Sequence, residues 1–138
     1  TAEVLWPPPS ADVNAPSGNN DGLVVRIRLG DKALLFTADI EKQAESAVLK
    51  EGVDLRSDIV KVPHHGSRTS STPAFVAATR PSLAIISVGR TSLFGHPDKE
   101  VVERWRASGA EVMTTGLRGT ISVTTDGHAL VVSTFVPQ

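Results

Sequence analysis

The stretch DIVKVPHHGSRTSS, residues 58–71, predicts a short apolar strand that leads directly into a polar loop. The apolar run at 59–62 ends at Pro63, which cannot donate a sheet hydrogen bond. The polar residues that follow predict a loop, and Pro73 is then well placed to begin a helix that continues through Ala78. A strand, a loop and a helix in this order indicate an α/β fold.

Outward from this stretch, strands alternate with helices in the middle of the chain, and hairpins are expected at both ends. Two β-rich runs flank the turn at Gly30 and predict one hairpin. The composition of residues 1–22, rich in proline and glycine, predicts mostly loop, with the end of a strand at 4–6. The other expected elements are helices at 39–49 and 98–109 and strands at 83–88, 111–114, 119–125 and 128–134. The pattern predicts a mixed α/β fold in one domain over residues 1–138.

Composition excludes several functions. The 138 residues have a formal net charge of −1 and no cysteine. Disulfides, thiolate metal sites and a cysteine nucleophile are therefore excluded, and a metal would need His, Asp or Glu ligands. The charge balance also argues against a strongly basic nucleic-acid binder, and no apolar run approaches the ~20 residues of a membrane span. Because the chain starts at Thr1 rather than Met, we expect it to be part of a longer protein.

Polar residues with catalytic potential follow three of the expected strands. Asp39 follows the first, the pair His64-His65 follows the second, and His96 lies in the loop after the third. Loops at the ends of neighbouring strands meet at one edge of a sheet, so we expect these side chains to converge.

The chemistry of these residues leaves alternatives open. A histidine pair beside Gly66 can supply a metal ligand and a proton-transfer group, whereas Asp39 taken alone could simply cap a helix. His96 could equally be an ordinary loop residue. His128 follows a hairpin turn and is expected to face solvent without a role.

The polar run after the histidine pair is also open to two interpretations. Ser67, Arg68 and Ser70 could bind phosphate, or they could belong to a solvated loop. A serine hydrolase is disfavoured because the sequence has no Gly-x-Ser-x-Gly motif.

Several motifs together resemble the extracellular metallo-β-lactamase-like domain of the ComEC family of competence DNA-uptake proteins. They cover nearly the whole chain, and 58–71 is the most specific of them. The motifs are VLWPP at 4–8, NN at 19–20, LFTADIE at 35–41, KVPHHGS at 61–67 followed by TSS at 69–71, ISVG at 86–89 and GHP at 95–97.

The resemblance implies the C-terminal half of a four-layer αββα sandwich with metal ions between the sheet edges. It places Asp39 as the metal-bridging carboxylate and His65 as a metal ligand. His64 and His96 would then be catalytic residues that face substrate, and Ser67, Arg68 and Ser70 would contact it. The His-x-His-x-Asp-His motif of the first half is absent from this sequence. We therefore expect two divalent ions, Zn or Mn, in the complete domain and weak or no binding by this segment alone.

The implied function is that of a metal-dependent phosphodiesterase or nuclease domain which acts on single-stranded DNA during natural transformation. It would lie on the extracellular or periplasmic side of a bacterial membrane protein whose remainder forms a DNA channel. The segment alone would be inactive, and its uncovered sheet would favour a dimer or a domain swap. The alternative is a non-catalytic DNA-binding or scaffold module of the same protein.

Overall fold

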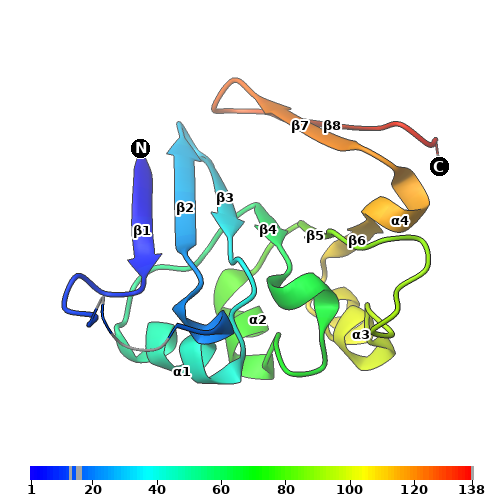
Figure 1. Ribbon diagram of the computed structural model, residues 1–138. Coiled ribbons are helices and arrows are strands. Elements are labelled where there is room, and N and C mark those ends of the chain that lie inside the picture. The colour runs from blue at the N-terminus through cyan, green and yellow to red at the C-terminus, as the bar shows by residue number, and fades with distance from the viewer. Residues whose placement is uncertain (13, 15–16, 138) are drawn as a thin grey trace.

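The computed structural model describes residues 1–12, 14 and 17–137, and it has an α/β architecture with one mixed six-stranded sheet (Figure 1). The order along the sheet follows the order along the chain. The first three strands pair antiparallel, and each later strand pairs parallel with its predecessor. The strands are β1 (Ala2–Trp6), β2 (Val24–Leu29), β3 (Lys32–Phe36), β4 (Ile59–Lys61), β5 (Leu83–Ile86) and β6 (Glu111–Thr114). The predicted mixed α/β fold is confirmed.

Three helices cover one face of the sheet, and a separate hairpin lies over the other (Figure 1). The helices are α1 (Lys42–Lys50), α2 (Pro73–Thr79) and α3 (Lys99–Ala107), and the hairpin consists of β7 (Ile121–Thr125) and β8 (Leu130–Thr134). Short helical turns are η1 (Asn19–Asp21), η2 (Pro63–Gly66) and α4 (Thr115–Arg118). In the described residues no helix is both long and apolar enough to span a membrane.

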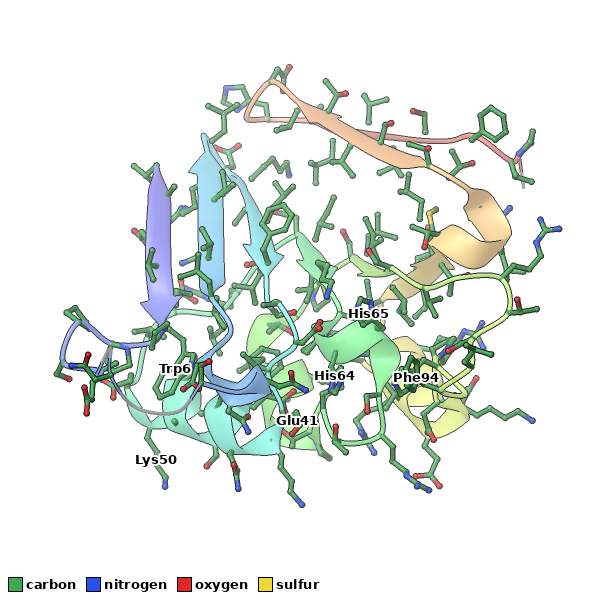
Figure 2. The ribbon with its side chains drawn as sticks, in the orientation of Figure 1. Trp6, Glu41, Lys50, His64, His65 and Phe94 are labelled. Atoms are coloured by element: carbon green, nitrogen blue, oxygen red, sulfur yellow. The ribbon has the colours of Figure 1, made fainter. Side chains whose placement is uncertain are left out.

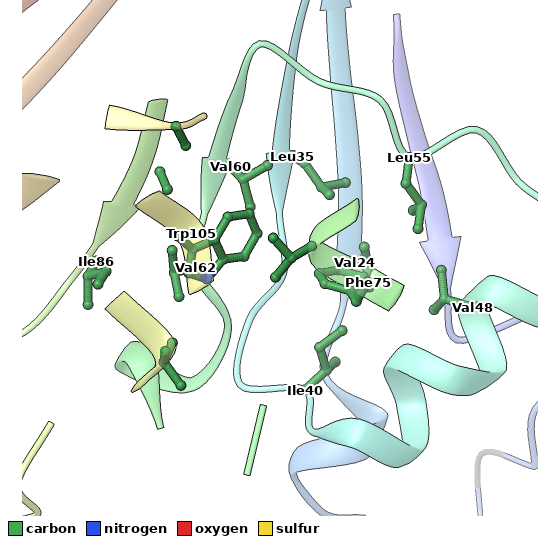
Figure 3. Packing of buried hydrophobic residues seen from close by; sticks show 14 of the residues in the cluster. Val24, Leu35, Ile40, Val48, Leu55, Val60, Val62, Phe75, Ile86 and Trp105 are labelled. Atoms are coloured by element: carbon green, nitrogen blue, oxygen red, sulfur yellow. The ribbon is translucent and has the colours of Figure 1, made fainter. Parts of the chain in front are cut away.

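The main core lies between the sheet and the three helices (Figure 3). Alternation along each strand sends Leu35, Val60 and Ile86 towards the helices, where they meet Phe75 and Trp105. Full burial of apolar side chains of this size stabilises a fold by about 1.5–3 kcal/mol each, so this cluster holds the helices on the sheet.

The opposite face of the sheet is covered only in part. Ile59, Leu83 and Met113 pack there against the inner side of the β7–β8 hairpin. The antiparallel register places Val4, Ile27 and several neighbours on this same face. Val4, Ile27, Leu29 and Phe36 are all exposed.

One local expectation was wrong, and another is confirmed in part. Helix α1 begins at Lys42 with Glu41 as its N-cap residue, so Asp39 lies before the helix and does not cap it. The strand end expected at 4–6 is confirmed by β1, which pairs with β2, and the expected loop that follows contains η1; residues 13, 15 and 16 of that loop lie outside the described residues. The domain boundaries implied by the family resemblance stay a prediction.

Candidate functional site

The predicted convergence is observed at the carboxyl ends of β3, β4 and β5. Asp39 Oδ1 lies 3.4 Å from His65 Nε2. The ring of His64 lies 6.4 Å from that of His65 and 5.9 Å from that of His96, centroid to centroid. In Figure 2 His65 lies above His64, Glu41 lies below them and Phe94 lies to their right. The strand ends therefore bring together the side chains of four residues, although the first, Asp39, and the last, His96, are 57 positions apart in the sequence.

The backbone of the histidine pair is left-handed rather than extended. His64 has φ 46° and His65 has φ 55°, a conformation that costs a non-glycine residue roughly 1–2 kcal/mol. Gly66 continues the positive φ, and a Cβ atom there would lie 2.7 Å from Cβ of Pro97. This turn therefore packs closely against the loop that carries His96. Strained backbone of this kind persists only where surrounding contacts enforce it.

The ring of His65 has the hydrogen-bonding pattern of a metal-ligating histidine. Its Nδ1 lies 2.6 Å from the carbonyl oxygen of Ser87, and because a carbonyl only accepts, Nδ1 carries a proton. In the neutral ring Nε2 is then unprotonated and faces the Asp39 carboxylate. A histidine that donates one ring N–H to a carbonyl and points its other nitrogen at a carboxylate fits a divalent cation between the two.

Lys61 also contributes to the electrostatics around Asp39. Its ammonium donates to the carbonyl oxygen of Ala38 over 2.9 Å and lies 3.6 Å from Asp39 Oδ1. Burial lowers the pKa of Lys61, and the neighbouring Asp39 carboxylate opposes that effect. The Asp39 carboxylate therefore lies near both the Lys61 ammonium and the Nε2 atom of His65.

Metal ligands are few in this segment. Among the residues that the structure describes, no group of three or more His, Cys, Asp or Glu side chains is arranged to hold a metal ion. The assignment of Asp39 and His65 as metal ligands stays a prediction.

His64 belongs to a second set of contacts, which includes a residue that the sequence analysis did not single out. Its Nδ1 lies 3.2 Å from Oε1 of Glu41. The hydroxyl of Thr69 donates to the same carboxylate oxygen over 2.8 Å. The signal in the sequence was the position of Glu41 two residues after Asp39 in the same loop.

The predicted phosphate-binding residues differ in accessibility. Arg68 is exposed, whereas Ser67 and Ser70 are buried. The hydroxyl of Ser70 is directed at the carbonyl oxygens of Pro63 and Ser67, at 3.2 and 2.9 Å. Ser70 therefore stabilises the loop in this structure, and Arg68 is the member of the three that solvent reaches most freely.

The loop that carries His96 forms one wall of an open pocket of about 490 Å³. His65, Phe94 and His96 line it together with residues 87–89, which follow β5. The ring of Phe94 stacks on His96 at 6.1 Å between centroids, and Phe94 is 84% exposed. A flat aromatic surface therefore borders the histidine cluster.

His128 lies outside this cluster, as expected. It is on the β7–β8 turn, its side chain is exposed, and its Nδ1 lies 3.2 Å from Oδ2 of Asp31.

Comparison with known proteins identifies homologues but no matching family model. The chain is 33% identical over 105 residues to ComE operon protein 3 of Bacillus subtilis (strain 168), and 38% identical over 104 residues to Competence protein ComA of Neisseria gonorrhoeae. It is 30% identical over 105 residues to Recombination protein 2 of Haemophilus influenzae (strain ATCC 51907 / DSM 11121 / KW20 / Rd). These matches cover 75–76% of this chain and 13–15% of the relatives.

These matches are to much larger proteins, two of which carry competence-related names. The resemblance to the ComEC family seen in its motifs is confirmed by these relatives, to which the chain is similar over about three quarters of its own length. The segment spans about one seventh of the length of these relatives.

Proposed function

We propose that this chain is the C-terminal half of a metallo-β-lactamase-like domain with metal-dependent phosphodiesterase activity on single-stranded DNA. The domain would serve DNA uptake during natural transformation, on the extracellular or periplasmic side of a membrane protein. The observation that carries the proposal is the pair formed by Asp39 and His65, in which Asp39 Oδ1 and His65 Nε2 face each other across 3.4 Å.

The uncovered face of the sheet supports the assignment to half of a domain. Val4, Ile27, Leu29 and Phe36 form an apolar surface that the β7–β8 hairpin leaves exposed. Exposed apolar patches of this kind mark interaction sites, and the remainder of the protein is the proposed partner.

In the complete domain Asp39 and His65 would hold part of a centre of two divalent ions, Zn or Mn. When bound, such ions activate water and stabilise the charge of an in-line displacement at phosphorus. The backbone carbonyl of Ser87 fixes the ring of His65 so that Nε2 is available as a ligand. His64 would transfer a proton at Nε2, His96 would contact the leaving group or phosphate, and Arg68 would bind a neighbouring phosphate.

The test is release of nucleotides from end-labelled single-stranded DNA by the full-length protein with added Mn or Zn. We expect metal-dependent cleavage that Asp39→Ala abolishes and His128→Ala leaves unchanged, while the 138-residue segment alone is inactive. Wild-type activity in the Asp39→Ala variant would contradict the assignment of the Asp39 carboxylate as a metal ligand. DNA binding without cleavage by the wild type, under every metal condition, would favour the non-catalytic DNA-binding or scaffold module.

A further inference from the structure

The ring of His64 is contacted at both nitrogens, at Nδ1 by Glu41 and by the Thr69 hydroxyl, which lies 3.4 Å away, and at Nε2 by Asn19; the contacts with Glu41 and Asn19 select the same tautomer. Nδ1 lies 3.2 Å from the carboxylate of Glu41, which only accepts hydrogen bonds, so Nδ1 carries the proton. Nε2 lies 3.5 Å from the side-chain nitrogen of Asn19, which only donates. The unprotonated nitrogen is therefore Nε2.

The carboxylate of Glu41 is itself held in place by the loop that follows His64. Thr69 Oγ1 donates to Glu41 Oε1 over 2.8 Å, and the hydroxyl of Ser67 lies 3.0 Å from that of Thr69. The backbone N–H of Glu41 donates to Asn20 Oδ1 over 3.1 Å. Glu41 is thus fixed from both its backbone and its side chain.

Glu41 occupies the N-cap position of α1, yet its side chain does not serve that helix. An N-cap side chain usually accepts from a backbone N–H of the first turn, and among the described residues that of Glu41 makes no such bond. The carboxylate is turned to His64 instead. Both side chains are largely buried, with 21% of His64 and 28% of Glu41 exposed, so the pair is partly shielded from solvent screening.

We propose that Glu41 is a positioning residue that holds His64 in the Nδ1–H tautomer and so keeps Nε2 unprotonated, as the nitrogen that can accept a proton from water or substrate. The effect on catalysis rests on the proposed phosphodiesterase function, whereas the effect on the tautomer does not. Thr69 supports the same arrangement because it orients the carboxylate of Glu41.

The direct test is the ¹⁵N NMR spectrum of the histidine rings in the 138-residue chain labelled at histidine nitrogens. Wild-type His64 should show a protonated Nδ1 and an unprotonated Nε2. Glu41→Ala should move His64 to the Nε2–H tautomer that predominates in free histidine. Glu41→Gln, whose amide oxygen can still accept from Nδ1, should keep most of the wild-type tautomer, and the matched control Glu51→Ala should leave it unchanged.

The outcomes decide the inference in either direction. A wild-type tautomer of His64 in a folded Glu41→Ala variant overturns it. Where Glu41→Ala does not fold, as judged by its backbone amide spectrum, Thr69→Val decides by the same criterion: it should shift His64 in the same direction by a smaller amount, and no shift overturns the inference.

An activity measurement on the full-length protein separates this inference from the proposed function. Glu41→Ala should lower kcat for single-stranded DNA by about tenfold to a hundredfold at unchanged KM, with partial recovery in Glu41→Gln. An unchanged kcat in Glu41→Ala overturns the positioning role. If the full-length wild type cleaves no DNA with any divalent metal, the proposed function fails, and the NMR result alone decides the role of Glu41.

Discussion

His64 and His65 are neighbours in the chain, yet their rings have separate partners. His65 is oriented by the Ser87 carbonyl and faces Asp39, whereas His64 is oriented by Glu41. The left-handed backbone at both residues separates the two rings, which meet at an interplanar angle of 64°. This division is consistent with one histidine as a ligand and the other as a proton-transfer group.

At the residue scale we predict that the 138-residue chain binds Zn or Mn weakly. Asp39 and His65 are fewer than the four ligands of a closed zinc site, so the Kd should be weaker than about 1 μM. Isothermal titration calorimetry measures this directly. Asp39→Ala should remove the residual binding, and His128→Ala should not change it. Stoichiometric binding of two ions per chain at nanomolar Kd would show that the segment holds a complete site.

His64 and His65 lie on η2, and helices α1 and α3 hold the loop that follows it. Glu45 of α1 is fully buried and accepts hydrogen bonds from the backbone N–H groups of Ser71 and Thr72. From α3, Arg104 donates to the carbonyl oxygen of Ser71 and Trp105 donates to its hydroxyl. Ser71 itself has φ 59°, so these contacts hold a strained position.

At the element scale we predict that Glu45→Ala destabilises the chain by at least about 2 kcal/mol, because two buried N–H groups lose their acceptor. Urea unfolding followed by tryptophan fluorescence measures the change. Glu51→Ala, an exposed glutamate at the end of the same helix, should stay within about 0.5 kcal/mol of wild type. Equal effects of the two substitutions would contradict the anchoring role.

The same carboxylate makes stability depend on pH. Burial raises the pKa of Glu45 above the ordinary value for glutamate. The folded state therefore holds this proton more tightly than the unfolded state, and the stabilisation decreases as pH rises through the raised pKa. Relative to Glu45→Gln, the wild type should lose free energy of unfolding as the pH rises above the ordinary pKa of glutamate, until it passes the raised pKa of the folded state. A constant difference over that range would show that the folded and unfolded chains bind this proton equally.

At the scale of the whole molecule, the two sheets meet at their turns as well as through their apolar faces. Gly127, on the β7–β8 turn, accepts a hydrogen bond from the backbone N–H of Asp31 over 2.8 Å. A Cβ atom at Gly30 would lie 2.5 Å from the carbonyl oxygen of Gly127. The approach is too close for any side chain at Gly30, so this contact fixes how the hairpin lies over the sheet.

We predict that Gly30→Ala destabilises the chain more than Gly52→Ala. Both glycines have positive φ, but a Cβ atom at Gly52 would meet open space. Gly52→Ala should therefore lower the free energy of unfolding only by the roughly 1–2 kcal/mol that positive φ costs an alanine. Gly30→Ala should lower it by the same amount and by about 1–3 kcal/mol more, because of the steric clash. Urea midpoints measured on the two variants test this, and equal midpoints would mean that the hairpin moves freely away from the sheet.

The sequence by itself determined the mixed α/β class, the main strands and helices and the gathering of Asp39, His64, His65 and His96. These features depend on local information, because periodicity and chain breakers define elements and parallel strands bring their carboxyl ends to one edge. The short helix α4 was not foreseen, since its first residue is held by hydrogen bonds to the backbone of Val88, just after the end of β5.

Only the tertiary structure decided which way the site residues point. The left-handed backbone at His64 and His65, the N-cap at Glu41 and the burial of Ser70 all result from contacts between segments remote in sequence. Glu41 meets His64 across 23 positions, and Glu45 meets Ser71 across 26. Side-chain direction follows from φ, ψ and the hydrogen bonds that enforce them, and these bonds exist only once the sheet and helices have packed.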